Sequence, residues 1–494
     1  MTDTTFEAIA MIIYFVAMIL IGLWAYMRTN DIDDYMLAGR DLNPFVAALS
    51  AGASDMSGWL LMGLPGALYA SGMAESWIAI GLTIGAWVNW RAVAPRLRTY
   101  TEVAGNAITI PSFLDNRLHD PRHLMRRVAG VVILVFFTFY VSSGMVAGGT
   151  FFESSFGMDY RLGMTIVAAI TILYTLVGGF LAVSYTDLVQ GIMMVVALIA
   201  VPVVGVIRLG GPGEVVTAVG AVDPNYWALV GSSVSVMGVI SAVAWGLGYF
   251  GQPHIIVRFM AIRTPGEATQ ARRIGIGWML FAVCGAAATA IVGVAVYKQD
   301  PAALTNPEAV FITLGQLLFH PLVAGFMLAA ILAAIMSTIS SQLLVTSSAL
   351  IEDLYRTIRT GELSSNHLVL ASRTAVLGVS LVAAAMAWSR NDTILGLVAF
   401  AWAGFGASFG PTVLLSLYWR RLTATGAVAG MLIGMVTVLV WGNIEGGPGG
   451  IFDLYEIIPG FLLNLLVTWT VSSASSPAEE VTEEFNAAMA ALRK

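Results

Sequence analysis

The chain has 494 residues, of which 58% are hydrophobic and only 11% are charged, and its mean hydropathy is +0.82. Soluble domains carry roughly 25% charged residues, so this composition excludes an ordinary soluble protein. The net charge of −6 says little about partners, because the positions of the charges matter more than their sum, and no nucleic-acid partner is expected. The single cysteine, Cys284, excludes an intrachain disulfide. Apolar stretches of about 20 residues, each long enough to cross a ~30 Å hydrocarbon core, recur along the chain. The sequence therefore predicts an all-α integral membrane protein.

Thirteen transmembrane helices are expected. The first apolar run, Phe6 to Tyr26, is too long for the core of a signal peptide and follows no basic segment, so we expect it to remain as a span. The spans are expected near residues 7–27, 44–69, 74–94, 126–150, 162–181, 188–207, 232–257, 274–297, 321–349, 370–389, 393–418, 424–441 and 450–473. The ninth is long enough to continue past the bilayer. The short acidic segment after Ser472 is expected to be a solvated tail.

Glycine and polar residues interrupt spans 2 and 7. Span 2 contains the run SAGASDMSG from Ser50 to Gly58, and span 7 contains the run WGLGYFGQP from Trp245 to Pro253. The two spans are five apart, and because five is odd they would enter the membrane from opposite sides. Discontinuous helices at corresponding places in two inverted repeats are typical of secondary transporters, which bind substrate and ions at the breaks.

Lysine and arginine in the loops predict the orientation, because cytoplasmic loops carry an excess of them. With the N-terminus outside, thirteen spans place 20 of the 24 basic residues in the cytoplasm. The four that remain outside are Arg161, Arg208, Lys298 and Arg390. We therefore expect a multi-pass protein of the cell membrane with its N-terminus outside and its C-terminus in the cytoplasm.

Asp55 is the most informative residue, because it lies within an apolar span and is flanked by small residues. A carboxylate at membrane depth is costly unless it is paired, hydrated or functional, and such groups usually mark ion or substrate pathways. The alternative is that Asp55 caps the helix break by accepting hydrogen bonds from backbone amides. We favour the functional interpretation.

The ninth span contributes hydroxyl groups at Ser337, Thr338, Ser340 and Ser341, and the three serines share one helical face. Neutral oxygens suit a hard monovalent cation that must also leave again. Serine and threonine in membrane helices also bond to the carbonyl four residues earlier, so the motif alone leaves both interpretations open.

Four aromatic residues lie beside the interrupted or polar segments: Trp59, Tyr140, Trp245 and Tyr249. Such rings would wall a site for a small apolar ligand with a charged group, although most membrane aromatics are packing groups or interfacial anchors. The chain has no GxxxxGK[ST] loop, and its five histidines lack the spacing of metal ligands. We therefore expect a transporter and not an enzyme.

Several runs resemble the sodium:solute symporter family. They are SAGASDMSGWLLMGLPG from residue 50, WGLGYFGQPHI from 245, ILAAIMSTISSQLLVTSSALIEDLY from 331 and FAWAGFGASFGP from 400. Two family signatures also fit, one from Tyr174 to Ala182 and one from Ser416 to Gly430. The resemblance extends from about Asp33 to about Gly460. The long runs are most similar to the members of the family that carry L-proline.

The resemblance implies a five-plus-five inverted-repeat core of the leucine-transporter type. It divides the chain into an accessory helix (1–30), a first repeat (44–208), an inverted second repeat (232–419), two accessory helices (424–473) and a cytoplasmic tail (474–494). It implies sodium-coupled uptake of L-proline across the lipid bilayer by alternating access. Another small solute, such as pantothenate, a sugar or another amino acid, remains an alternative, as do proton coupling and a sensor or channel built on the same fold.

The resemblance also assigns residues to sites. The sodium motif falls on the carbonyls of Ala53, Met56 and Ala334 and the hydroxyls of Ser337 and Thr338. L-Proline is expected near Ser57, Gly58, Trp59, Tyr140, Trp245, Tyr249, Gln252 and Pro253. Asp55 matches an essential acid, and Arg40 and Asp187 match positions that influence sodium coupling. Asp187 with Ser337, Ser340 and Ser341 is a hypothesis for a second sodium site.

Overall fold

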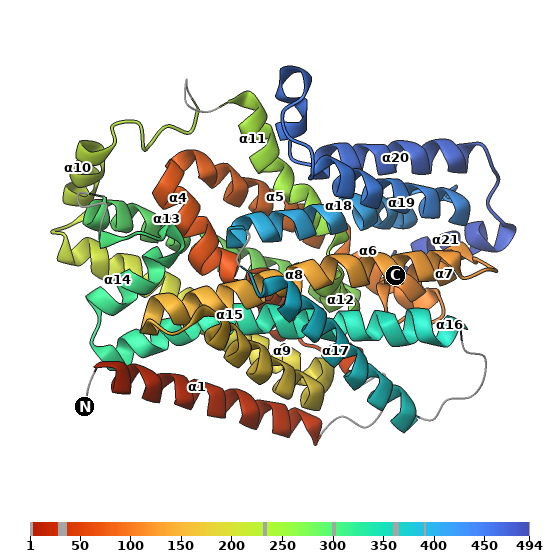
Figure 1. Cartoon of the computed structure of the whole chain (residues 1–494). Coiled ribbons are helices and arrows are strands. Elements are labelled where there is room, and N and C mark those ends of the chain that lie inside the picture. The colour runs from red at the N-terminus through yellow and green to blue at the C-terminus, as the bar shows by residue number, and fades with distance from the viewer. Residues whose placement is uncertain are drawn as a thin grey trace.

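The computed structural model describes residues 3–27, 37–230, 235–298, 303–358, 365–389 and 392–493, and all of its regular elements in these ranges are helices (Figure 1). In the first half they are α1 (Asp3–Tyr26), η1 (Ala38–Arg40), α3 (Pro44–Asp55), η2 (Trp59–Gly63), α4 (Leu64–Ser71), η3 (Met73–Glu75), α5 (Ser76–Ala92), α6 (Ala94–Val103), α7 (Ile110–Leu118), α8 (Leu124–Phe156), α9 (Tyr160–Arg208) and α10 (Pro212–Val222).

In the second half they are α11 (Val236–Val243), η4 (Ala244–Gly251), α12 (Pro253–Ala261), η5 (Pro265–Glu267), α13 (Ala268–Tyr297), η7 (Pro307–Ala309), α14 (Val310–Leu318), α15 (Pro321–Ser348), η8 (Ala349–Tyr355), α16 (Arg356–Ile358), α17 (Ser365–Ala387), α18 (Ile394–Tyr418), α19 (Ala424–Trp441), η9 (Pro448–Asp453), α20 (Ile457–Ser473) and α21 (Glu479–Ala491).

Each of the thirteen predicted spans overlaps one or more of these helices. Within the described residues, eight helices are long and apolar enough to cross a membrane, and the bent pair Pro44–Asp55 and Trp59–Ser71 makes a ninth. The other predicted spans fall on shorter helices or on helices that are broken, such as α9, which is interrupted at Gly179. Gly179 has a φ of 61°, a backbone conformation that favours glycine. The all-helical membrane architecture is confirmed, and the count of thirteen stays a prediction.

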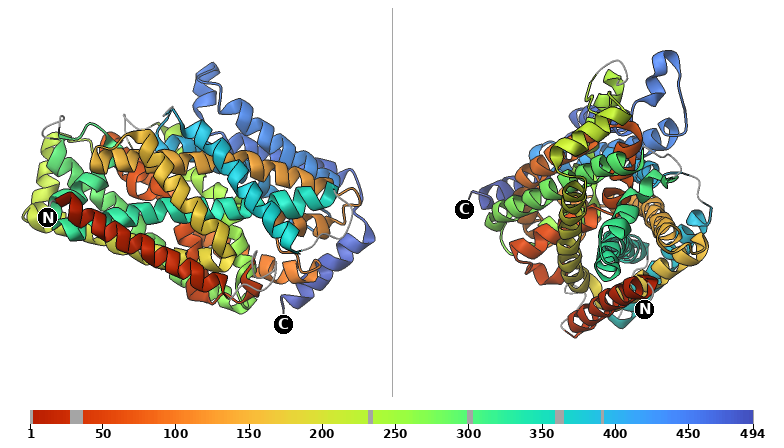
Figure 2. Two further views of the ribbon diagram at one scale, coloured as in Figure 1. Left: turned by 60° about the horizontal axis from the view of Figure 1, so that its bottom comes forward. Right: turned by 90° about the vertical axis from the view of Figure 1, so that its left-hand side faces the viewer.

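Helix α15 forms the centre of the bundle. Its side chains from Leu328 to Leu344 are buried, and it packs against α1, α8, α9, α3 and α17. Figure 2 shows α15 enclosed by these helices when the bundle is viewed along its length. Helices α19 and α20 pack on each other and on α18 at the side of the bundle away from α1. A mainly apolar helix that is buried on all sides is typical of the centre of a bundle.

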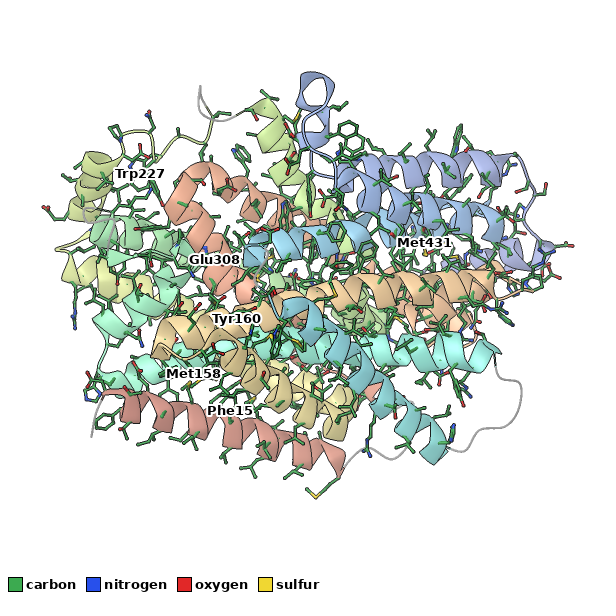
Figure 3. All side chains as sticks on the ribbon, in the orientation of Figure 1. Phe15, Met158, Tyr160, Trp227, Glu308 and Met431 are labelled. Carbon is green, nitrogen blue, oxygen red and sulfur yellow. The ribbon has the colours of Figure 1, made fainter. Side chains whose placement is uncertain are left out.

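Side chains join the ends of neighbouring helices. The Tyr160 hydroxyl donates to the carbonyl of Ala387 at 2.9 Å, and the amide of Ile394 donates to Glu308 Oε1 at 2.9 Å. Tyr160 and Glu308 are labelled in Figure 3. At the other end of the bundle, the amide of Leu42 donates to the carbonyl of Ala261 at 3.1 Å. This last contact joins the first residues before α3 to the end of α12, so the two interrupted segments are tied together.

The prediction of a solvated tail is wrong for α21, which docks on α6 and α7. Val481 and Ala488 are buried, and Phe485 lies between them on the same face. The buried Arg117 of α7 donates to the carbonyl of Val481 at 3.2 Å and lies 5.2 Å from the Phe485 ring. Burial of this apolar stripe and the charged hydrogen bond explain why the segment packs against the bundle.

Candidate functional site

The break in span 2 lies where the glycine and polar residues predict it. Helix α3 ends at Asp55, the C-cap Met56 has φ −87° and ψ 79°, and α4 continues at an angle of 62°. The Asn43 side chain caps the start of α3 by accepting from the amides of Phe45 and Val46. Because the helix ends, the amide of Ser57 donates to the carbonyl of Asp55 at 3.1 Å and not to that of Ala53. The break therefore frees the Ala53 carbonyl for another donor.

That donor is a hydroxyl of the central helix. Ser337 Oγ lies 2.8 Å from the carbonyl oxygen of Ala53 and 3.0 Å from that of Ala334, and Thr338 Oγ1 lies 3.2 Å from the Ala334 carbonyl. Four of the five predicted sodium ligands are thus joined by hydrogen bonds, and Met56 follows three residues after Ala53. All of these residues are buried. They form a compact set of neutral oxygens, which fits a hard monovalent cation.

Asp55 faces the second interrupted segment. Its Oδ2 accepts a short hydrogen bond from the Tyr249 hydroxyl, while Oδ1 has no partner within the described part of the chain. The side chain is 3% exposed. A buried carboxylate with one free oxygen is costly in a membrane unless a ligand, a water or a cation meets it. Asp55 therefore bonds across to η4 through a side chain, and the alternative role of capping α3 is not what its carboxylate does here.

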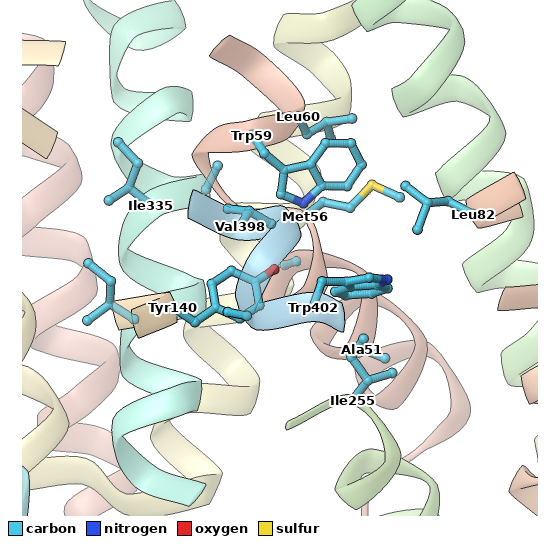
Figure 4. Close-up of a cluster of buried hydrophobic side chains, with 14 of the residues drawn as sticks. Ala51, Met56, Trp59, Leu60, Leu82, Tyr140, Ile255, Ile335, Val398 and Trp402 are labelled. Carbon is cyan, nitrogen blue, oxygen red and sulfur yellow. The ribbon is translucent and has the colours of Figure 1, made fainter. Parts of the chain in front are cut away.

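An aromatic cluster surrounds the break. The rings of Trp59 and Trp245 are 6.5 Å apart, Trp245 stacks on Trp402 at 6.4 Å, and Tyr249 meets Trp402 edge-on at 5.1 Å. Figure 4 shows Trp59, Tyr140 and Trp402 arranged around the start of α18 and the broken helix. All of these rings are buried. The structure thus places the four aromatic residues predicted from the sequence close together, and Trp402 lies among them.

Trp402 was not predicted as a site residue, although it joins α18 directly to η4. Its Nε1 donates to the carbonyl of Trp245 at 2.8 Å, and its own carbonyl accepts from Gln252 Nε2 at 3.1 Å. A Cβ on Gly248 would lie 1.9 Å from Trp402 Nε1, so glycine is required there for the ring to approach. The signal was present: Trp402 is the one tryptophan in a run of small and phenylalanine residues, FAWAGFGASFGP.

The remaining predicted substrate residues lie beside the same break. Ser57 Oγ accepts from the amide of Trp59 at 3.4 Å, and a Cβ on Gly58 would lie 2.9 Å from that of Ala147 in α8. Gln252 is buried, its Oε1 has no partner within the described residues, and Pro253 begins α12. A buried polar atom without a partner in the described residues, Gln252 Oε1, therefore lies where span 7 resumes as a regular helix.

Asp187 lies on α9 within a second polar cluster. Its Oδ2 accepts from Ser50 Oγ at 2.7 Å and from Arg258 Nη2 at 3.0 Å. Arg258 Nη2 also donates to Ser341 Oγ at 2.7 Å. Both members of the ion pair are buried. Arg258 was not predicted, because nothing in the sequence indicates which acid a buried arginine on another helix will meet.

The hydroxyl of Ser340 and the guanidinium of Arg40 make other contacts. Ser340 Oγ donates to the carbonyl of Ser337 at 3.0 Å, within its own helix. Arg40 donates to the carbonyl of Ala107 at 2.6 Å and to Thr101 Oγ1 at 3.0 Å. Arg40 also donates to the carbonyl of Met260 at 3.0 Å, so it helps to fix the end of α12. Arg40 therefore joins the segment before α3 to α12, and its influence on sodium coupling stays a prediction.

Comparison with known proteins gives consistent results. A model of the sodium:solute symporter family matches residues 35–434. The chain is 58% identical to the high-affinity proline transporter PutP of Bacillus subtilis, over 95% of this chain and 98% of that protein. It is 52% identical to the osmoregulated proline transporter OpuE of the same organism, over 93% of both chains. It is 50% identical to the sodium/proline symporter of Staphylococcus aureus, over 98% of this chain and 96% of that protein.

Two solved structures show the same fold. A substrate-bound, outward-open Na⁺-coupled sialic acid symporter aligns with a TM-score of 0.81 at 18% identity, over 96% of this chain and 99% of the other. A closed nucleobase-cation-symport-1 family transporter aligns with a TM-score of 0.56 at 14% identity, over 93% of this chain and 99% of the other.

Proposed function

The chain belongs to the sodium:solute symporter family, and from this premise we propose that it takes up L-proline together with sodium by alternating access. One observation carries the ion assignment: the Ser337 hydroxyl bridges the carbonyl of Ala53 at the break of span 2 and that of Ala334 in α15. Sodium bound there would link the two helices directly. The high identity to two proline transporters and a sodium/proline symporter supports the substrate.

We propose that sodium is held by the carbonyls of Ala53, Met56 and Ala334 and the hydroxyls of Ser337 and Thr338. L-Proline would bind at the neighbouring break, within the walls formed by Trp59, Tyr140, Trp245, Trp402 and Tyr249 and beside Ser57, Gly58, Gln252 and Pro253. The ring of proline suits the aromatic walls, and its charged groups suit the free backbone groups of the broken helix. Because both ligands order the same break, each raises the affinity of the protein for the other by the same factor.

The inward sodium gradient and the membrane potential would drive accumulation, at ~2.3 kcal/mol per charge per 100 mV. The proposal includes thirteen spans, with the N-terminus outside and the C-terminus in the cytoplasm of a plasma-membrane protein. Residues 44–208 and 232–419 form the two inverted five-helix repeats, flanked by accessory helices at 1–30 and 424–473 and by the tail at 474–494. A second sodium ion at Asp187, Ser337, Ser340 and Ser341 is proposed for a conformation in which Arg258 has moved away.

The test is uptake of labelled L-proline into proteoliposomes that contain the purified chain. An inward sodium gradient should make uptake exceed equilibrium, and excess unlabelled proline should abolish the signal. Equal sodium on both sides is the control, and a proton gradient without sodium tests proton coupling. If sodium drives no proline uptake, the substrate must be sought among pantothenate, sugars and other amino acids by a competition panel. Overshoot with the proton gradient alone would refute sodium coupling.

A further inference from the structure

An apolar groove lies on the membrane-facing side of η4. It has a volume of about 530 Å³ and runs between α5 on one side and α11 and η4 on the other. Ile84 and Val88 form its first edge, Val243, Leu247 and Phe250 its second, and Ile458 of α20 also lines it. Ile84 is 57% exposed, so the groove is open to the outside of the bundle. Helices α5 and α11 lie next to each other, as Figure 1 shows.

Two glycines of α5 create the groove. A Cβ on Gly81 would lie 2.3 Å from the carbonyl oxygen of Val243, and one on Gly85 would lie 2.2 Å from that of Gly246. The backbone of α5 therefore touches the backbone of the α11–η4 segment directly. At this close approach the larger side chains diverge to the two edges, and they leave an apolar channel between them.

The groove contacts the back of the segment that carries the aromatic cluster. Residues three apart share a face in a 3₁₀ helix, so Ala244, Leu247 and Phe250 face the groove together. Trp245 and Tyr249 of the same segment lie in the buried cluster around Asp55. Any occupant of the groove would therefore restrict the movement of η4 from behind.

Two basic residues lie near the C-terminal end of α5, where the groove lining of this helix ends at Val88. Arg91 is exposed on α5, less than one turn beyond Val88, and Arg272 of α13 lies 5.8 Å from the ring of Trp87. Trp87 is 48% exposed, as is typical of a tryptophan at the membrane–water interface. The proposed orientation places this end at the cytoplasmic surface, where anionic headgroups are concentrated. The positive charges of Arg91 and Arg272 thus complement the negative charge of a phosphate group.

The length of the groove fits one leaflet. The ten residue steps from Gly81 to Arg91 rise about 15 Å at 1.5 Å per step, which equals half of a hydrocarbon core of ~30 Å. We propose that an anionic phospholipid of the cytoplasmic leaflet binds here, with an acyl chain in the groove and its phosphate between Arg91 and Arg272. The proposal depends on the orientation given above and not on the identity of the transported solute.

Native mass spectrometry of the full chain tests the binding. The probes are phosphatidylglycerol and phosphatidylcholine with identical acyl chains, added to protein that has been stripped of lipid. The wild type should retain one phosphatidylglycerol much more strongly than phosphatidylcholine. Each basic residue near a membrane surface contributes ~1 kcal/mol to the binding of anionic lipid. The double variant Arg91→Gln/Arg272→Gln should therefore weaken phosphatidylglycerol binding about 30-fold.

The matched control is Arg420→Gln/Arg421→Gln, which removes two exposed arginines between α18 and α19. It should leave phosphatidylglycerol binding within about threefold of the wild type. Equal losses in the two double variants would show a diffuse charge effect and would overturn the proposed site. So would equal retention of the two lipids by the wild type.

A second variant tests the groove itself. Val88→Trp fills the channel beside Phe250 and leaves both arginines in place, so it should reduce retention of phosphatidylglycerol as strongly as the arginine variant does. Unchanged retention would show that the acyl chain lies elsewhere and would overturn the proposal. A dimer that forms in the wild type and dissociates in Val88→Trp would assign the groove to a second copy of the chain and would also overturn it.

Discussion

The sharpest prediction concerns the hydroxyl of Ser337. In Ser337→Ala the carbonyl of Ala53 loses its donor at 2.8 Å, and the proposed sodium site loses one of its five oxygens. An interaction of this kind with a charged partner contributes ~1.5–3 kcal/mol. At 1.4 kcal/mol per tenfold change, the sodium concentration for half-maximal uptake should rise about 10- to 150-fold. The cost to folding should be smaller, about 1 kcal/mol, since a neutral hydrogen bond is lost.

The assay is the initial rate of proline uptake into proteoliposomes as a function of external sodium, at fixed proline and fixed membrane potential. The control is Ser347→Ala on the same helix. Ser347 is equally buried, but its hydroxyl donates only to the carbonyl of Leu344, at 3.3 Å. Its sodium dependence should match that of the wild type. If both variants give half-saturation within twofold of each other, Ser337 is not a sodium ligand.

Three further variants test the surroundings of the site. Tyr249→Phe removes the donor to Asp55 Oδ2 and should raise the half-saturating proline concentration at least tenfold, while the amount of protein in the membrane stays unchanged. An unaltered half-saturating concentration would show that the hydrogen bond between Tyr249 and Asp55 does not contribute to proline binding. Arg258→Gln leaves Asp187 buried without its cation and should cost about 3–5 kcal/mol, seen as a lower Tm, whereas addition of Asp187→Asn should restore much of the loss. Arg117→Ala should speed amide hydrogen exchange across α21 at least tenfold without an effect on α15, and equal exchange in variant and wild type would contradict its role as the docking residue.

The breaks in spans 2 and 7 could be predicted because their cause is local. Glycine and polar residues in an apolar stretch weaken the helix wherever the chain places it, so the run around Asp55 interrupts α3 as expected. The pairing of Ser337 with Ala53 was reachable only through the family resemblance, because it joins residues 284 positions apart. No periodicity within either segment indicates which helix will lie opposite.

The residues that were missed share one property: their partners come from distant segments. From its sequence neighbours alone, Trp402 is expected to be a packing residue. It forms part of the aromatic cluster because Gly248 lets η4 approach its ring closely. Helix α21 is a different case, since Val481, Phe485 and Ala488 already form an apolar stripe at spacings of four and three. That pattern favoured docking over solvation, and the weight given to the acidic composition of the tail led to the wrong prediction.

The cluster around Asp187 has consequences for the number of ions carried. Arg258 Nη2 bonds to both Asp187 Oδ2 and Ser341 Oγ, so the guanidinium occupies two of the oxygens that the hypothesis assigned to a second sodium ion. Two cations at hydrogen-bond distance from the same buried oxygens repel each other strongly, because the surroundings screen charge poorly. A second sodium can therefore bind only after Arg258 leaves. A measured ratio of one charge per proline that Asp187→Asn does not change would mean that the arginine stays throughout the cycle, whereas a ratio of two would require the ion pair to open in every turn.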